Sequence, residues 1–201
     1  KDWEVVELGS IAELTSSKRI FEGDYVQDGI PFYRGQEISQ LLNGEPLIIK
    51  CYISRSKYKI LESSFGAPKR GDILITAVGT LGNAYLVDTD VPFYFKDGNL
   101  IWLKKIKDSV HGRYLIKQIE WLKPKILEGA IGSSQKALTM VVLKDLNVPM
   151  PNIAEQTAIA NVLSNMDTEL NALQQRLAKT QQLKQGMMQE LLTGKTRLVA
   201  V

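Results

Sequence analysis

Gly194, Lys195 and Thr196, near the end of the 201-residue chain, have the residue types that close a phosphate-binding P-loop. That motif needs a glycine five positions before the Gly-Lys pair, with a strand before the loop and a helix after it. Position 189 is Gln189, and apolar, helix-forming residues precede the triplet. Because the order is helix and then glycine, we interpret Gly194 as a helix stop and expect no nucleotide binding.

Asp72 and Asp97 are carboxylates close to basic residues, as in the site of a metal-dependent nuclease. No Glu-x-Lys follows Asp72 to complete such a site. The single histidine, His111, and the single cysteine, Cys51, form neither a zinc-binding cluster nor a Cys–His nucleophile pair. We expect His111 at a surface or helix end, Cys51 to be structural or incidental, and no catalytic or metal-binding residues.

The basic residues are grouped, although the net charge is only +3. Residues 50–70 carry six Lys or Arg against Glu62 alone, and residues 96–125 carry eight against three acidic residues. Solvated faces often have this composition, but two such groups make an anionic polymer a reasonable partner. No apolar run approaches the roughly 18–20 residues of a membrane helix, and no secretory leader is recognisable. A single cysteine also fits a reducing compartment, so we expect a cytoplasmic protein.

Residues 1–150 are predicted to form a mixed α+β globule, because short β-rich runs alternate with Gly, Pro, Asn or Asp every 8–12 residues. A helix is predicted near 110–128, kinked or divided at Pro124. Residues 129–139 form a Gly- and Ser-rich loop leading to another strand. The strands are predicted at 30–35, 72–78, 83–88, 92–95 and 99–106, with a hairpin around Gly79 and Gly82 and with Tyr33, Tyr85, Tyr94 and Trp102 in the core.

Residues 151–201 are predicted to form a second domain dominated by one long helix. Pro149 and Pro151 should end the globule, because neither can donate a backbone hydrogen bond. Asn152 and Glu155 are close to a capping box, and no proline follows before Leu192. About 40 residues of helix would be roughly 60 Å long.

The apolar residues of this helix repeat at alternating intervals of four and three, which is typical of a coiled-coil seam. Thr180 interrupts the seam, and the apolar residues then resume on a nearby register. A helix this polar on its other faces needs a second helix, or it folds back over its own domain. The predicted contact residues are Ile159, Leu163, Met166, Leu170, Leu173 and Leu177, followed by Leu183, Met187 and Leu191.

At these residues the chain resembles the DNA-specificity subunits of type I restriction-modification systems. "WEVVELGSIAEL", "IPFYRGQEI" and "GDILITAVGTLGNAYLV" are similar to parts of a target recognition domain. "VPMPNIAEQTAIANVLSNMD" and "LKQGMMQELLTGKTRL" resemble the two ends of the long conserved helix in this family. The order and spacing of these segments are more specific than any one of them.

The resemblance implies a non-catalytic recognition subunit that binds double-stranded DNA and reads one half of a bipartite target. It implies methyltransferase and restriction subunits as partners, with S-adenosylmethionine, Mg²⁺ and ATP used only in those subunits. Full members of the family hold two recognition domains and two conserved helices, whereas this chain holds one of each. The resemblance therefore implies either a half-subunit that pairs with a second copy or one half of a longer chain, and in both cases it implies that the two helices run antiparallel.

DNA contacts are expected from polar or basic side chains on loops and turns, because these can reach base edges or phosphates. Arg34 and Gln36 follow a predicted strand and precede a glycine turn, where they could contact guanine or adenine. The 129–139 loop is the preferred base reader or phosphate clamp, and the resemblance supports this choice. The candidates are Lys18, Arg19, Arg34, Gln36, Thr80, Asn83, Lys96, Asn99, Ser133, Ser134, Gln135 and Lys136.

Two other functions stay open on the sequence alone. The chain could be a standalone DNA-modifying enzyme, which turnover with DNA, Mg²⁺ and S-adenosylmethionine would reveal. It could also be a coiled-coil adaptor whose globule binds protein, in which case it would lack the salt-dependent DNA binding that phosphate contacts give.

Overall fold

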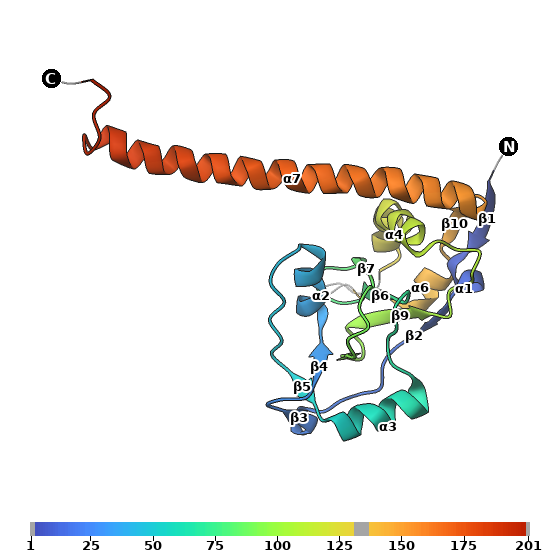
Figure 1. The fold of residues 1–201 in the computed structure, drawn as a ribbon. Helices are drawn as coiled ribbons and strands as arrows, with labels where there is room; N and C mark the ends of the chain where they lie inside the picture. The colour runs from blue at the N-terminus through green and yellow to red at the C-terminus, as the bar shows by residue number, and fades with distance from the viewer. Residues whose placement is uncertain (1–2, 131–136, 200–201) are drawn as a thin grey trace. The chain divides into compact units, whose positions relative to one another are not determined.

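The computed structural model describes residues 3–130 and 137–199 (Figure 1). The chain separates into two compact units, Lys1–Thr157 and Ala158–Val201. The elements are β1 (Glu4–Glu7), α1 (Leu8–Ile11), β2 (Glu13–Thr15), the 3₁₀ turn η1 (Glu22–Asp24), β3 (Tyr25–Val26), β4 (Ile30–Tyr33), α2 (Gly35–Leu42), β5 (Tyr52–Ile53), α3 (Arg55–Phe65), β6 (Ile73–Thr76), β7 (Ala84–Leu86), β8 (Tyr94–Phe95), β9 (Leu100–Lys104), α4 (Gly112–Trp121), α5 (Lys123–Glu128), α6 (Met140–Lys144), β10 (Asn147–Met150) and α7 (Ile153–Leu192).

The first unit is built on an antiparallel sheet with the strand order β2-β9-β6-β7. Each of the five predicted strand segments contains a strand. The predicted hairpin is confirmed as β6–β7, with Ile75 opposite Ala84. Gly79 and Gly82 lie in its turn with φ of 78° and 73°, a conformation that L side chains rarely adopt. The sequence therefore predicted the strands that carry several of the candidate DNA contacts.

Side chains alternate across β6, so that the sheet separates two hydrophobic clusters. Ile73 and Ile75 pack with residues of α1, α4, α5 and α6 on one face. Leu74 faces the opposite cluster, which includes Ile38 of α2 and Trp102 of β9. All three β6 side chains are fully buried, as expected for a strand covered on both faces.

A second sheet has the order β3-β5-β4-β8, in which β4 and β8 run parallel. Figure 1 shows α3 beside β3 and β5, and Tyr58 and Leu61 of α3 pack against Phe32 in a third cluster. The prediction that the strand aromatics belong to the core is confirmed. Tyr33, Tyr85, Tyr94 and Trp102 are all buried.

The helices α2, α3 and α6 lie in segments for which the sequence predicted no helix. Gly35 begins α2 where a glycine turn was expected. The basic segment 50–70 contains α3, whose first turn is capped by the Ser54 hydroxyl accepting from the Lys57 N–H at 3.2 Å. The segment after 129–139 forms α6 before the strand β10; the Thr139 hydroxyl caps this helix by accepting from the Val142 N–H, and its Leu143 is buried in the core.

The predicted helix near 110–128 is divided into α4 and α5, and Pro124 lies in the first turn of α5. A proline is tolerated there because first-turn N–H groups have no partner within the helix. Pro149 pairs with Val5 inside β10, the last strand before α7. Among the described strands, β10 pairs with β1 alone, and the Pro149 carbonyl accepts from Tyr114 on the side away from β1, so this proline costs no ladder hydrogen bond.

The predicted long helix is confirmed as α7, which has 40 residues. The Asn152 side chain accepts from the Glu155 N–H at 3.0 Å and so caps its start. Gly194, with φ of 71°, follows its end, and Lys195 pairs with Glu190. The sequence order is thus helix and then glycine, the reverse of a P-loop.

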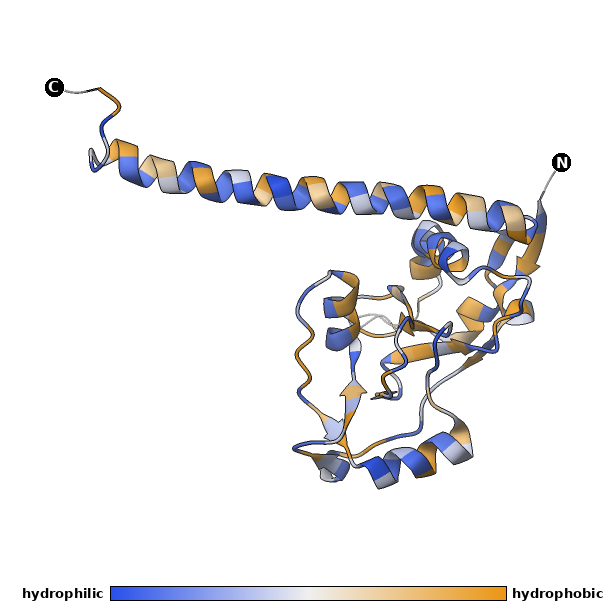
Figure 2. Ribbon diagram, viewed as in Figure 1, coloured by the Kyte–Doolittle hydropathy of each residue, from blue (hydrophilic) through white to orange (hydrophobic). Residues whose placement is uncertain are grey.

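Apolar residues recur along α7 between polar ones (Figure 2). In the second unit, Met166, Leu170, Leu173 and Leu177 are each more than half exposed. Leu183 and Met187 continue the exposed series, whereas Ile159, Leu163 and Leu191 are partly buried. Among the described residues, no helix is both long and apolar enough to cross a membrane.

Candidate nucleic-acid interface

Four of the predicted DNA contacts line one open hollow in the first unit: Arg34, Gln36, Thr80 and Asn99. They come from the start of α2, the β6–β7 turn and the residue before β9. The hollow has a volume of about 370 Å³, and its remaining lining residues are Gly35, Ser39, Thr76, Val78 and Gly79.

Backbone contacts bring these three segments together. The Ala77 N–H donates to the Asn99 carbonyl at 2.8 Å, which places the end of β6 beside the start of β9. The Val78 carbonyl lies near Gly35: a Cβ placed on this glycine would be 4.0 Å from the carbonyl oxygen. The hollow is therefore formed where α2 meets the β6–β7 turn.

Hydrogen bonds to Thr76 hold the β6–β7 turn. Its hydroxyl donates to the Thr80 carbonyl and accepts from the Asn83 N–H, the latter at 3.0 Å. Its carbonyl accepts from the Gly82 N–H at 2.8 Å. Because these bonds use main-chain atoms of the turn, the exposed side chain of Thr80 stays available for an external contact.

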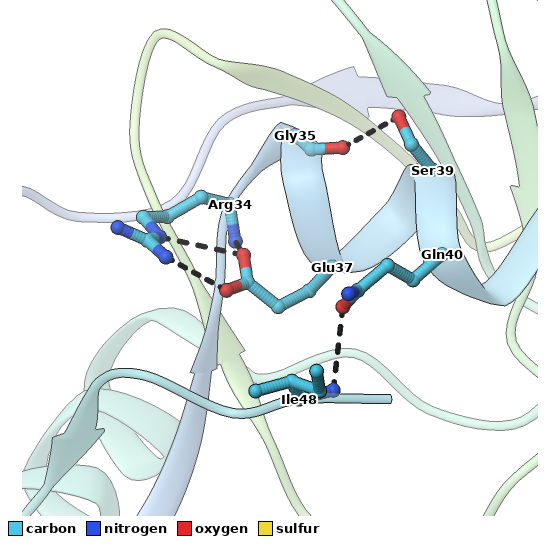
Figure 3. Close-up of polar contacts among 6 residues, drawn as sticks. All are labelled: Arg34, Gly35, Glu37, Ser39, Gln40 and Ile48. Atoms are coloured by element: carbon cyan, nitrogen blue, oxygen red, sulfur yellow. Dashed lines mark hydrogen bonds and ion pairs between the residues drawn. The ribbon is translucent and has the colours of Figure 1, made fainter. Parts of the chain in front are cut away.

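Arg34 is held by Glu37, one turn into α2 (Figure 3). The Arg34 Nη2 lies 2.8 Å from one oxygen of the Glu37 carboxylate, and Nε lies 3.3 Å from the other. These hydrogen bonds raise the pKa of the Arg34 guanidinium further above its ordinary value. Gln36, by contrast, is exposed on the same turn.

Lys18, Arg19 and Lys96 lie outside the lining of the hollow. Arg19 pairs with Asp97 at 3.0 Å, and Lys18 Nζ lies 4.5 Å from the centre of the Phe65 ring. The Lys96 N–H donates to the Tyr33 carbonyl at 2.8 Å. These contacts place the three residues around β8 and the β8–β9 turn, and none of them lines the hollow.

Asn83 is engaged inside the protein, because its side-chain oxygen accepts from Lys123 Nζ at the start of α5. Lys123 belongs to the basic group at 96–125, but the sequence analysis did not single it out. A lysine in the first turn of a predicted helix gives no signal of a contact with a hairpin 40 residues earlier. The candidates Ser133, Ser134, Gln135 and Lys136 lie outside the described residues.

The two carboxylates considered for a nuclease have structural partners. The Asp72 carboxylate accepts from the Lys69 N–H and from Trp102 Nε1, both at 2.9 Å. Burial raises the pKa of Asp72 in spite of these hydrogen bonds. Across 3–130 and 137–199, no three His, Cys, Asp or Glu side chains lie together as metal ligands would. As expected for a helix-end histidine, His111 caps α4 by accepting from the Tyr114 N–H.

Proteins similar in sequence to this chain are named as specificity subunits of type I restriction enzymes. A protein provisionally named as a type I restriction enzyme specificity subunit from Haemophilus influenzae is 30% identical over 86% of this chain and 42% of its own length. The type I restriction enzyme MjaVIII specificity subunit of Methanocaldococcus jannaschii is 24% identical over 98% of this chain and 47% of its own length. These names agree with the prediction of a recognition subunit that is not itself an enzyme. The chain spans less than half the length of the relatives it matches.

Solved structures share the fold. The crystal structure of the HsdS subunit from Thermoanaerobacter tengcongensis matches 94% of this chain with a TM-score of 0.66 and 19% identity. A chain from a structure of type I restriction-modification assembly matches with a TM-score of 0.70 and 20% identity. Each match covers less than half of the solved chain, 44% and 45%. Residues 1–185 match the family described as the type I restriction modification DNA specificity domain, and the chain belongs to that family.

Proposed function

We propose that this chain reads one half of a bipartite double-stranded DNA target through the face around the hollow. One observation carries the proposal: in a chain of the DNA specificity family, three separate segments bring Arg34, Gln36, Thr80 and Asn99 to one lining. Carboxamides suit the N6 and N7 edge of adenine, and a guanidinium suits the O6 and N7 edge of guanine. The lining thus offers side chains of the types that read bases.

Base contacts should contribute much of the DNA affinity, because the first unit has little excess positive charge. Lys1–Thr157 contains 20 Lys and Arg residues against 19 Asp and Glu residues. Phosphate attraction supplies most sequence-independent affinity, so a nearly neutral unit should bind random DNA weakly. Pairing two recognition units on one target would raise the affinity through effective concentration.

The partners are part of the same proposal. In it the seam of α7 pairs with a second copy of the chain or with its counterpart in a longer chain. Methyltransferase and restriction subunits then use S-adenosylmethionine, Mg²⁺ and ATP, and this chain carries no cofactor. The proposed division follows the one suggested by the sequence, with recognition in 1–150 and assembly through 151–201.

Duplex binding measured by fluorescence anisotropy over a range of salt concentrations tests the proposed interface. Gln36→Ala and Asn99→Ala should each weaken binding to a preferred duplex, by about 5- to 150-fold if a bidentate base contact is lost. Lys179→Ala, an exposed position in the second unit, is the matched control and should bind as the wild type does. Equal affinities for all four proteins would contradict the proposed interface.

The same preparation tests the alternatives. Methylation or cleavage of DNA by this chain alone, with Mg²⁺ and S-adenosylmethionine supplied, would identify a standalone enzyme. Absence of any salt-dependent DNA binding would favour a protein-binding adaptor.

A further inference from the structure

Arg34 and Glu37 form one hydrogen-bonded unit at the rim of the hollow (Figure 3). The two oxygens of the Glu37 carboxylate accept from Nε and Nη2 of Arg34, and one of them also accepts from the Arg34 backbone N–H at 2.9 Å. The Glu37 side chain is fully buried, whereas the Arg34 side chain is 28% exposed. The carboxylate therefore holds one edge of the guanidinium of a partly exposed side chain that lines the hollow.

The N–H groups that Glu37 leaves unused form a second two-pronged donor. A guanidinium has five N–H donors in one plane, and Glu37 accepts from Nε and once from Nη2. The remaining donors, on Nη1 and Nη2, have no hydrogen-bond acceptor within the described part of the chain. They form the end of the side chain, and Arg34 lines the hollow.

We infer, on the basis of the proposed function, that Arg34 reads a guanine through this free edge and that Glu37 is the residue that positions it. Guanine presents O6 and N7 in the major groove, and two parallel N–H donors from one arginine match them. Contact with DNA costs side-chain entropy when a long side chain must first be ordered. A guanidinium already fixed by Glu37 has lost much of that freedom on folding.

Helix capping accounts for the bond from the Arg34 backbone N–H to Glu37, but not for the two bonds from the guanidinium. Glu37 is the third residue of α2, and its acceptance of the Arg34 N–H satisfies the capping requirement. A glutamine would keep an acceptor for that N–H, but it would lose the charge and one of the two acceptors for the guanidinium. Glu37→Gln therefore separates the capping role from the positioning role.

The test measures base preference, which a merely structural change would not alter at one position alone. The preferred half-site is first obtained by selection from random duplexes with the wild-type chain. Affinities are then measured for every single-base replacement in that half-site, with the wild type, Arg34→Lys, Glu37→Gln and the control Lys179→Ala. Circular dichroism and thermal unfolding confirm that each variant is folded.

Arg34→Lys should lose the preference for guanine at one position, by about 5- to 150-fold, because lysine keeps the charge but not the planar fork. Glu37→Gln should weaken the preference at the same position, and both variants should keep the wild-type dependence on salt. Neither effect should occur in Lys179→Ala. If Glu37→Gln fails to fold, Arg34→Lys still decides whether Arg34 reads the guanine.

Three outcomes would overturn the inference in distinguishable ways. An unchanged base preference in Arg34→Lys would show that Arg34 contacts phosphate or lies off the DNA. Loss in Arg34→Lys with none in a folded Glu37→Gln would remove the positioning role of Glu37. A wild-type chain that enriches no sequence would contradict the proposed function itself, and the guanine contact with it.

Discussion

At Arg34, the side chain proposed to contact DNA also neutralises a buried carboxylate. Arg34→Glu would place a second negative charge beside Glu37, and breaking a buried ion pair costs about 3 kcal/mol or more. We therefore expect the variant to lose roughly that much free energy of unfolding in urea titrations. Lys59→Glu, at an exposed position on α3, is the control and should change stability by less than about 0.5 kcal/mol.

An Arg34→Glu protein as stable as the wild type would show that the pair contributes little to the fold. A loss of DNA binding in this variant cannot by itself identify a DNA contact, because the fold is altered as well. Arg34→Lys keeps a positive charge and is the more informative substitution for binding.

Lys195 tests the other residue-scale interpretation, that the Gly-Lys-Thr triplet binds no nucleotide. It follows the end of α7 and pairs with Glu190. We expect no heat of ATP binding in a calorimetric titration, for the wild type or for Lys195→Ala. Stoichiometric ATP binding that Lys195→Ala abolishes would contradict this interpretation.

The sequence correctly placed some candidate residues on turns, namely those between strongly patterned strands. Their contacts with DNA stay predictions. Thr80 and Asn99 were recognisable as turn residues because a glycine-marked hairpin and the apolar run of β9 lie beside them. Glu37 was not found, because its role depends on burial and on a side chain three residues earlier. The DNA contact of Asn83 stays a prediction, and its hydrogen bond with Lys123, 40 residues away, was not visible in the sequence.

At the level of elements, Gln156 joins the first turn of α7 to the rest of the first unit. Its side-chain oxygen accepts from the His111 N–H at 2.8 Å, and its nitrogen donates to the carbonyls of Ser109 and Pro151. The side chain is almost fully buried. These bonds fix the place where the long helix begins.

Gln156→Ala would leave these backbone groups without partners, at a cost of about 1–3 kcal/mol for a buried group. The free energy of unfolding should fall by that amount in urea titrations, whereas Gln181→Ala, an exposed position in the second unit, should leave it unchanged. Equal stability of the two variants would mean that water replaces these bonds at no cost.

Elements with clear start and stop signals could be predicted from the sequence, whereas most of the shorter helices could not. The 40-residue α7 and the β6–β7 hairpin were recognisable because a cap, a proline-free run or two turn glycines delimit them. The helices α1, α2, α3 and α6 have 4, 8, 11 and 5 residues and were missed. Helices this short are stabilised by tertiary packing, as Ile38 shows for α2, and packing partners are not visible in local sequence.

For the whole molecule, the exposed seam of α7 predicts association with a second copy or with a counterpart helix in a longer chain. Burying each apolar side chain of the seam is worth about 1.5–3 kcal/mol. Replacing Leu170 and Leu173 with Glu would place four like charges in a dimer seam and should yield monomers in light scattering. A wild-type chain that is already monomeric at tens of micromolar would rule out a homodimer of half-subunits.

Selection of bound sequences from a pool of random duplexes by the wild-type chain tests the central claim, that this chain recognises DNA sequence. The antiparallel pairing implied by the family resemblance would place two identical recognition units at opposite ends of a dimer. For a homodimer, the account predicts that the bound pool is enriched in two inverted copies of one half-site, separated by a spacer of fixed length and unrestricted sequence; for one half of a longer chain, it predicts enrichment of a single copy. A bound pool with the same base composition at every position as the starting pool would contradict it.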